Sequence, residues 1–204
     1  MHVAYLYKPQ GKRIFIKDMA YYLFAPNGEK TTLASSLSST TDGVNGNTAN
    51  RDANNPSVLP LSILSKFHFT FLIRHPRRAI PSYWRCTIPP LREITGFDYF
   101  APSEAGYEEL VRLFDYLIAE GIVDKDNLTV LDADDMLDNP EGAIRQYCAR
   151  TNIDFRPTML KWCEADKEHA AEHFAKWNGF HDDAINTMSL QARTHAQVSL
   201  YIID

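Results

Sequence analysis

Cysteine and positive charge are both scarce in this 204-residue sequence. The three cysteines show no paired spacing, and their odd number argues against a disulfide framework. The 21 lysines and arginines are outnumbered by 26 aspartates and glutamates, which gives a net charge of −5. An acidic chain gives no support to a role on nucleic acid or on an anionic membrane surface. We therefore expect reduced thiols, a cytoplasmic location and small-molecule partners.

Long apolar runs are absent as well. No stretch of the sequence approaches the ~20 apolar residues that span a bilayer, and the first residues turn polar too quickly for a secretory signal. We expect no association with a membrane. The hydrophobic fraction of 45% is that of an ordinary globular protein, and the length suits one well-buried core. The sequence thus predicts a single domain over residues 1–204.

One segment contains little that could join a core. Within residues 38–56, 15 of 19 residues are Ser, Thr, Asn, Asp, Gly or Pro. Such a composition buries too little apolar surface to offset the entropy lost on ordering. We expect residues 38–56 to form a disordered insertion. The segment is not a phosphate-binding loop, because Gly43 and Gly46 are not followed by Lys-Ser or Lys-Thr.

Residues 69–73 (Phe-Thr-Phe-Leu-Ile) form a bulky, mostly apolar run without alternation. This pattern is typical of a strand that helices cover on both faces, as in a parallel sheet. Pro76 suits the first position of a helix, since its missing N–H would be unpaired there anyway. Arg74 is therefore predicted at the carboxyl end of a strand, where open α/β sheets bind ligands. Its fork of donors suits a phosphate, and pairing with a nearby carboxylate is the alternative.

A second predicted strand end carries a lysine and an aspartate. Residues 12–17 are predicted as a short strand, followed by a helix that Asp18 would cap. Lys17 and Asp18 would then lie on the same rim of the sheet as Arg74. An aspartate at this position has a structural role at least as readily as a catalytic one.

His181 is the titratable member of a local cluster, Trp-Asn-Gly-Phe-His-Asp-Asp, over residues 177–183. Its ordinary pKa range makes it a candidate base, although a histidine in an acidic loop is more often simply solvated. Asp134 and Asp135 could be taken for a metal-binding pair. No histidine or third carboxylate keeps ligand spacing with them, so we assign them turn and cap roles and predict no metal site.

Two motifs, about 60 residues apart, resemble those of sulfotransferases. Arg74, followed by His-Pro and by Ser82 eight residues on, resembles the family's 3′-phosphate-binding motif. Later, the family has an acidic turn, a helix that opens with Asn-Pro-Glu, and an Ile-x-Phe exit. Residues 134–137, 139–141 and 153–155 follow that order.

The resemblance implies a fold and a sulfuryl donor. The fold would be α/β, with a parallel sheet covered by helices on both faces in the three-layer architecture of P-loop NTPase-type proteins. The donor would be 3′-phosphoadenosine 5′-phosphosulfate, and the resemblance implies that Arg74 and Ser82 hold its 3′-phosphate.

The resemblance also implies roles near the reacting group. Lys17 corresponds to a family lysine close to the sulfuryl bridge. Met19 stands where the family has a histidine base, and a methionine cannot accept a proton. Asp18 and His181 are therefore the remaining candidates for the base.

The family's first strand and its phosphosulfate-binding loop have no counterpart in this sequence. No Gly-x-x-x-x-Gly-Lys-[Ser/Thr] or Pro-Lys-Ser-Gly-Thr run occurs in the 204 residues. The backbone N–H groups and the lysine of such a loop hold the 5′-phosphosulfate, so we expect weak or no sulfuryl transfer by this chain. We expect a sheet without its first strand, whose open edge a second copy of the chain or the amino-terminal segment would cover. Two explanations for the missing loop are open. The sequence begins late, or the protein is a relative of the family that has lost the activity.

Three functions are compatible with these residues. The first is transfer of a sulfuryl group to a hydroxyl or amine of a small metabolite, such as a secondary metabolite. The second is a different metabolic enzyme that uses the same rim for a carboxylate or phosphate substrate. The third is a non-catalytic binding or partner protein that retains the fold. Donor binding separates the first from the others, and a turnover assay separates the second from the third.

Overall fold

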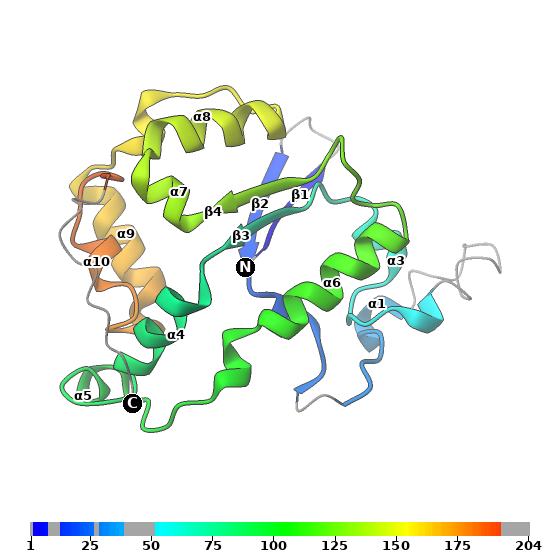
Figure 1. Cartoon of the computed structure of the whole chain (residues 1–204), viewed down its shortest axis with the longest axis horizontal. Coiled ribbons are helices and arrows are strands. Elements are labelled where there is room, and N and C mark those ends of the chain that lie inside the picture. The colour runs from blue at the N-terminus through cyan, green and yellow to red at the C-terminus, as the bar shows by residue number, and fades with distance from the viewer. Residues whose placement is uncertain (1, 8–12, 27–28, 39–51, 193–204) are drawn as a thin grey trace.

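The computed structural model of the chain describes residues 2–7, 13–26, 29–38 and 52–192. A short four-stranded sheet, in the order β2–β1–β3–β4, lies at its centre (Figure 1). The strands are β1 His2–Tyr7, β2 Arg13–Asp18, β3 Thr70–Ile73 and β4 Thr129–Asp132.

The sheet is mixed, which corrects the predicted all-parallel sheet. Among the described strands, β3 and β4 form the one parallel pair, with Phe71 opposite Val130. β1 pairs antiparallel with β3 at His2 and Val3, and antiparallel with β2 over its whole length. The physical reason is the short connection between β1 and β2, residues 8–12, because a parallel connection needs a crossover of about a dozen residues or more.

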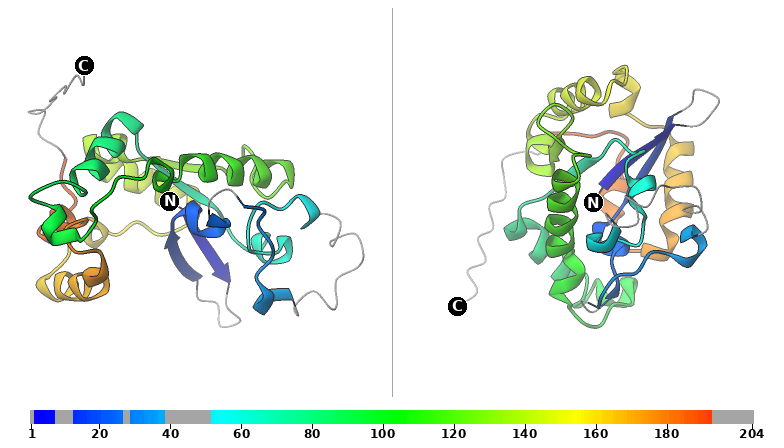
Figure 2. Two further views of the ribbon diagram at one scale, coloured as in Figure 1. Left: turned by 90° about the horizontal axis from the view of Figure 1, so that it is seen from below. Right: turned by 90° about the vertical axis from the view of Figure 1, so that its right-hand side faces the viewer.

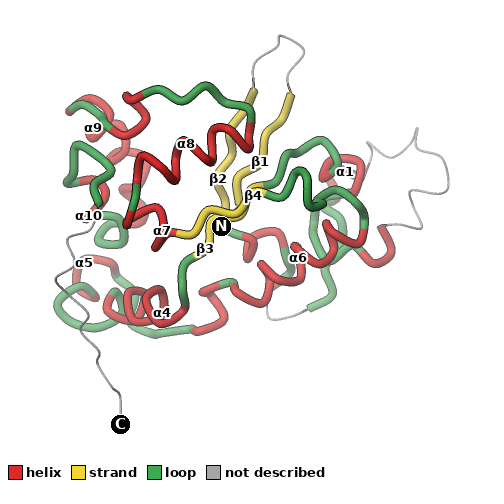
Figure 3. The backbone as a smooth tube through the Cα atoms, turned by 45° about the horizontal axis from the view of Figure 1, so that its top comes forward, coloured by secondary structure: helices red, strands yellow, loops and turns green. Residues whose placement is uncertain are grey.

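The β1–β2 hairpin lies against the edge of β3 that was expected to be open (Figure 3). Of the two ways to cover that edge, the structure therefore shows the amino-terminal segment. Two antiparallel steps restore the original direction, so β2 points the same way as β3 and β4. The carboxyl ends of these three strands consequently lie on one rim of the sheet, as predicted for β2 and β3.

Helices and single turns surround the sheet. The α-helices are α1 Ser35–Ser38, α3 Leu61–Leu64, α4 Pro76–Arg85, α5 Arg92–Thr95, α6 Tyr107–Ala119, α7 Ala133–Asp138, α8 Pro140–Thr151, α9 Glu164–Phe174 and α10 Asp182–Ile185. The 3-10 turns are η1 Ala20–Leu23, η4 Asp52–Asn54, η5 Pro102–Ala105, η6 Pro157–Leu160 and η7 Ala175–Trp177. Within the described ranges, none of these helices is long and apolar enough to cross a membrane.

Adjacent residues of β3 show which helices cover the strand. The Phe71 ring lies 5.3 Å from the Phe114 ring of α6, in an edge-to-face contact. The Thr70 hydroxyl lies 3.4 Å from the Tyr147 hydroxyl of α8. Neighbouring side chains of a strand point to opposite faces, so α6 and α8 lie on opposite sides of β3, as Figure 1 also shows.

The main apolar core lies between β3, α3 and α6. Leu64, Leu113 and Leu117 have no exposed surface. The remaining buried members of the cluster are Phe24, Leu61, Phe69, Phe71, Tyr116 and Val123. Figure 2 shows that α9 and α10 lie at the end of the molecule opposite to α3, away from this core. The candidate site described below is at that far end.

The segment predicted as a disordered insertion, residues 38–56, is described only in part. Residues 39–51 lie outside the described residues. Residues 52–56 are packed rather than disordered: Asn55 is 8% exposed, and Ser57, which follows them, is 1% exposed. The polar side chains of these last residues hydrogen-bond to one another and to backbone, which a count of apolar residues does not detect.

Candidate functional site

Arg74 directly follows β3 and is exposed at the rim of the sheet. Its backbone oxygen accepts a hydrogen bond of 2.9 Å from the Tyr107 hydroxyl, which ties the end of β3 to the start of α6. Burial raises the pKa of Tyr107, and the positive charge of Arg74 opposes that shift. Within the described part of the chain, no hydrogen bond or ion pair occupies the Arg74 guanidinium, so it can meet an anion from solvent.

The helix after Arg74 begins as predicted, with Pro76 at its first position. His75 caps α4, because its Nδ1 accepts a hydrogen bond of 3.1 Å from the Arg77 N–H. Ser82 is half-buried and lies six residues beyond Pro76, about 9 Å further along the helix axis. One phosphate can therefore contact both Arg74 and Ser82 only if the arginine side chain extends along α4.

An ion pair joins the start of α4 to α7, the helix that follows β4. Arg78 Nη1 lies 3.2 Å from Asp134 Oδ1, in the first turn of α7. Asp132 caps α7 and accepts a hydrogen bond of 2.7 Å from the Asp134 N–H. The cap residue is thus Asp132, and the Asp134 carboxylate pairs with Arg78 and fixes α4 relative to α7 at the rim.

A pocket of about 230 Å³ brings together two of the predicted site residues, Lys17 and His181. Lys17 comes from the end of β2, and His181 precedes α10. Its volume is below the ~300–1,000 Å³ of most drug-sized ligand sites, so it suits a small ring or a short chain. The other wall residues are Trp162, Asp166, Lys167, Ala170, Phe174, Ala184 and Ile185.

The electrostatics of this pocket favour a neutral imidazole. Burial lowers the pKa of His181, the positive charge of Lys17 lowers it further, and Asp182 opposes both effects. Burial also lowers the pKa of the Lys17 ammonium. His181 therefore carries a free lone pair at neutral pH and is able to accept a proton.

Long-range packing positions His181. The Phe180 ring lies 5.0 Å from the Phe97 ring, in an edge-to-face contact. Gly179 has a φ of +80°, and a Cβ at this position would lie 2.9 Å from the Thr95 side chain of α5. The loop that carries His181 thus packs closely against the region after α4, which requires glycine at position 179.

Asp18 does not line this pocket. Neighbouring side chains of a strand alternate between faces, so Asp18 points away from Lys17. Its carboxylate accepts a hydrogen bond of 2.8 Å from the Met19 N–H, and its charge adds to the burial that raises the pKa of Tyr22. The helix expected after Asp18 is only the 3-10 turn η1. The structure thus brings Lys17 together with His181 but not with Asp18.

The apolar wall of the pocket was not identified from the sequence. The backbone N–H of Trp162 donates to the Met188 carbonyl at 3.0 Å, and its indole N–H donates to the Thr187 carbonyl. These bonds hold the segment before α9 against the residues after α10. Phe174, at the end of α9, lies 4.6 Å ring to ring from His181. Ala170 and Phe174 are four residues apart and therefore lie on one face of α9. This spacing was the sequence feature that could have indicated the apolar wall.

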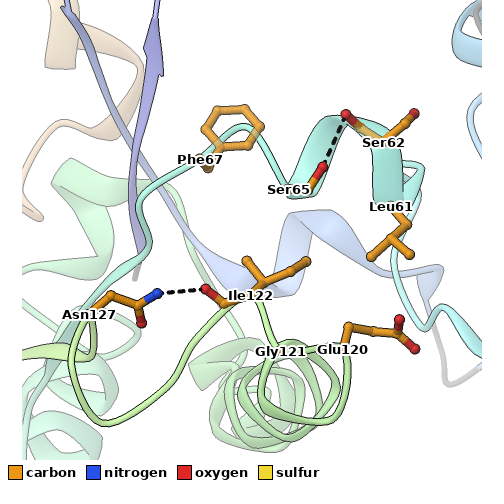
Figure 4. A pocket seen from close by; sticks show the side chains of 8 residues that line it. All are labelled: Leu61, Ser62, Ser65, Phe67, Glu120, Gly121, Ile122 and Asn127. Carbon is orange, nitrogen blue, oxygen red and sulfur yellow. Dashed lines mark hydrogen bonds between the residues drawn. The ribbon is translucent and has the colours of Figure 1, made fainter.

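A larger pocket, of about 410 Å³, lies at the opposite ends of the strands (Figure 4). Phe67 precedes β3 and Asn127 precedes β4, so this hollow is away from Arg74. Asn127 donates to the Ile122 carbonyl at 2.9 Å, and Ser65 donates to the Ser62 carbonyl. These polar side chains hydrogen-bond to backbone carbonyls, which is a structural role.

Comparisons with known proteins point to the same family as the motifs. The chain is 26% identical over 180 residues to "Sulfotransferase ppzF" of Metarhizium majus, which covers 80% of this chain and 51% of that protein. The protein of the same name from Metarhizium rileyi is 27% identical over 177 residues, with the same coverage. The chain spans about half the length of these curated relatives. These matches support a sulfotransferase-like family.

A second kind of relative shares a shorter segment. "Branched-chain-amino-acid aminotransferase-like protein 1" of Arabidopsis thaliana is 30% identical over 104 residues, which is 51% of this chain and 16% of that protein. So small a share of the plant protein carries no argument about its named activity. No protein-family model and no solved structure matches the chain.

Proposed function

We propose that this sulfotransferase-like chain takes part in sulfuryl transfer to a small metabolite. The observation that carries the proposal is the pocket in which Lys17 and His181 lie together beside an apolar wall. The similarity to two proteins named sulfotransferase, over 80% of the chain, supports it. The donor would be 3′-phosphoadenosine 5′-phosphosulfate, and the acceptor a hydroxyl or amine.

The rim at β3 and α4 supplies the donor side of the proposal. Arg74 is exposed and Ser82 half-buried, and the resemblance assigns both to the 3′-phosphate. Arg77 adds a second cation at the first turn of α4, where the helix dipole also favours an anion. These groups would bind the 3′-phosphate of the donor.

The Lys17–His181 pocket supplies the acceptor side. His181 would remove the proton of the acceptor hydroxyl as the new O–S bond forms and the bond to the bridging oxygen breaks. Lys17 would stabilise the negative charge that develops on that oxygen, and adenosine 3′,5′-bisphosphate would leave. The apolar side chains of Trp162, Phe174 and Ile185 would hold the body of a small acceptor.

Donor binding is the first test. We expect adenosine 3′,5′-bisphosphate, titrated calorimetrically, to bind the chain, and Arg74→Ala to weaken binding by about 10- to 150-fold. This is the loss of a charge-assisted contact of about 1.5–3 kcal/mol. Arg156→Ala, at an exposed arginine of the turn before η6, is the matched control and should bind like the parent. Equal affinities in the parent and Arg74→Ala would contradict the donor site.

Transfer itself is the second test. Because no phosphosulfate-binding loop occurs in the 204 residues, we expect slow transfer of labelled sulfate from the donor to a panel of phenols and alcohols. His181→Gln should reduce the rate by about 10²- to 10⁴-fold if this imidazole is the base. Transfer that is equally fast in His181→Gln would contradict that role. Donor binding without any transfer would instead favour a non-catalytic anion-binding protein.

A further inference from the structure

A cluster of possible metal ligands lies on α9, outside the pocket. His169, Glu172 and His173 are exposed, and their ligand atoms all lie within 4.8 Å of one another. Their spacing, His-x-x-Glu-His, places the second and third residues three and four positions after the first. Residues at these spacings are neighbours on one helix face. The helix backbone therefore holds two imidazoles and one carboxylate together.

The two histidine rings lie close together, and a hydrogen bond orients that of His173. The ring centroids lie 4.1 Å apart, and His173 Nδ1 lies 2.9 Å from the backbone oxygen of His169. A carbonyl oxygen can only accept, so in this hydrogen bond Nδ1 carries the hydrogen and Nε2 keeps its lone pair. Histidines that bind metals commonly donate their other ring N–H to a carbonyl in this way, which fixes the tautomer and the ring.

The charge on α9 also favours a cation. The helix carries four carboxylates, those of Glu164, Asp166, Glu168 and Glu172, and one lysine, Lys167. Lys167 forms an ion pair of 3.3 Å with Glu164, so its charge is already compensated at the start of the helix. Among the residues that the structure describes, no ion pair involves Glu168 or Glu172.

We propose that His169, Glu172 and His173 bind a divalent transition metal, with Zn²⁺ the best match. Two imidazole nitrogens and one carboxylate oxygen are a familiar zinc ligand set, and water or another ligand would complete the tetrahedron. Zinc bonds of about 2.0–2.2 Å place ligand atoms about 3.3 Å apart, so the exposed side chains need only rotate to close from the distances seen here. Mg²⁺ and Ca²⁺ prefer all-oxygen sites and fit poorly.

Binding at this cluster would stiffen one wall of the Lys17–His181 pocket. Lys167, Ala170 and Phe174 line that pocket from the neighbouring face of α9. A metal that bridges adjacent turns of α9 stabilises the folded helix and therefore raises the melting temperature of the protein.

Calorimetric titration of the 204-residue chain with ZnCl₂ tests the site. We expect one site in the parent, a loss of at least about 10-fold in affinity for His169→Gln or His173→Gln, and a larger loss in the double variant. Glu108→Gln, at an exposed carboxylate in the first turn of α6 and away from α9, is the matched control and should bind like the parent. Glutamine supports helix formation, and far-ultraviolet circular dichroism will show that the variants remain folded.

Two further readouts separate this site from adventitious binding. Co²⁺ should give the visible absorption of a tetrahedral nitrogen–oxygen site in the parent and not in the double variant. Zn²⁺ should raise the melting temperature of the parent but not that of the double variant. Equal zinc affinity in the parent and the double variant, or no binding by the parent up to about 1 mM ZnCl₂, would overturn the proposal. These outcomes are independent of sulfuryl transfer.

Discussion

At the scale of single residues, Asn55 organises the turn that leads into α3. Its side-chain amide donates to Asp52 Oδ1 at 2.9 Å and to the Leu59 carbonyl at 2.7 Å. Its oxygen accepts from both the N–H and the hydroxyl of Ser57, each at 2.9 Å. One buried side chain thus makes four hydrogen bonds that hold this turn together.

Replacing Asn55 should therefore be costly. We expect Asn55→Ala to lower the free energy of unfolding by about 2–3 kcal/mol, because several buried polar groups lose partners at once. Asn54→Ala is the matched control: Asn54 is exposed, and such a change typically stays within about 0.5 kcal/mol. Urea unfolding of both variants measures the difference. Equal stability of the two variants would show that the turn does not depend on the Asn55 side chain.

His181 should give the protein a measurable pH dependence. Its pKa in the folded state is lowered, chiefly by burial and then by Lys17, while in the unfolded chain it is about 6.5. Between these two values the unfolded state binds more protons, so stability falls as the pH drops below about 6.5. In His181→Gln that part of the pH dependence should disappear, as measured by urea unfolding at several pH values.

The same electrostatics can be tested by titrating the ring itself. We expect Lys17→Ala to raise the pKa of His181, because it removes the charge that opposes protonation, while burial still holds the value down. Lys167→Ala is the control, since Lys167 lines the same pocket but is paired with Glu164. The pKa of His181 follows from its ring-proton chemical shift. An unchanged pKa in Lys17→Ala would mean that the two groups do not interact.

At the scale of elements, the start of α8 depends on the Asn139 side chain and on the absence of a side chain at Gly142. Asn139 caps the helix by accepting a hydrogen bond of 3.1 Å from the Gly142 N–H. A Cβ on Gly142 would lie 2.3 Å from Asn139 Nδ2 and 2.9 Å from its Oδ1. Glycine at position 142 therefore leaves room for the cap, although glycine is an unfavourable residue in a helix.

This arrangement predicts a mutation whose effect depends on its background. Asn139→Ala should cost about 1 kcal/mol through loss of the cap. Gly142→Ala should gain little in the parent, because the new methyl displaces the Asn139 side chain. In the Asn139→Ala background, Gly142→Ala should stabilise by about 0.5–1 kcal/mol. A double-mutant cycle of urea unfolding measures the coupling. Identical effects of Gly142→Ala in both backgrounds would contradict the proposed competition.

At the scale of the whole molecule, Arg13 joins the amino-terminal hairpin to the end of α8. Its Nη1 donates to the carbonyl oxygens of Thr151 and Asn152, each at 2.7 Å. These are carbonyls at the helix end, where the helix dipole also favours a cation. Among the described residues, β1 pairs with β3 at just His2 and Val3, so this contact is an important attachment of the hairpin.

Removing the contact should loosen the hairpin. We expect Arg13→Ala to cost about 1–2 kcal/mol and to speed hydrogen exchange of the β1 and β2 amides more than that of α6. The pKa of His68 should rise as well, since it is lowered first by burial and then by the charges of Arg13 and Arg150. Arg156→Ala is again the control. Unchanged exchange in the hairpin would show that the strand pairing suffices to attach it.

The sequence by itself determined the local features of this protein. The strand predicted at residues 69–73 is β3, and the helices predicted to begin at Pro76 and Pro140 do so. These features depend on near neighbours in the chain: a proline fixes its own backbone, and a cap bonds to an N–H two or three residues away. The position of Arg74 at a strand end followed from the same local signals. The spacing of His169, Glu172 and His173 is a local feature of the same kind.

Only the tertiary structure decided which distant residues meet. The mixed sheet, the meeting of Lys17 with His181 and the separation of Asp18 from that pocket depend on the path of the whole chain. That path is set by long-range packing, such as Phe97 against the loop that carries His181. Many spatial arrangements of the same local elements satisfy the same propensities. Burial of shared apolar surface selects among these arrangements. A side chain's role in a site therefore became visible only once that packing placed its neighbours.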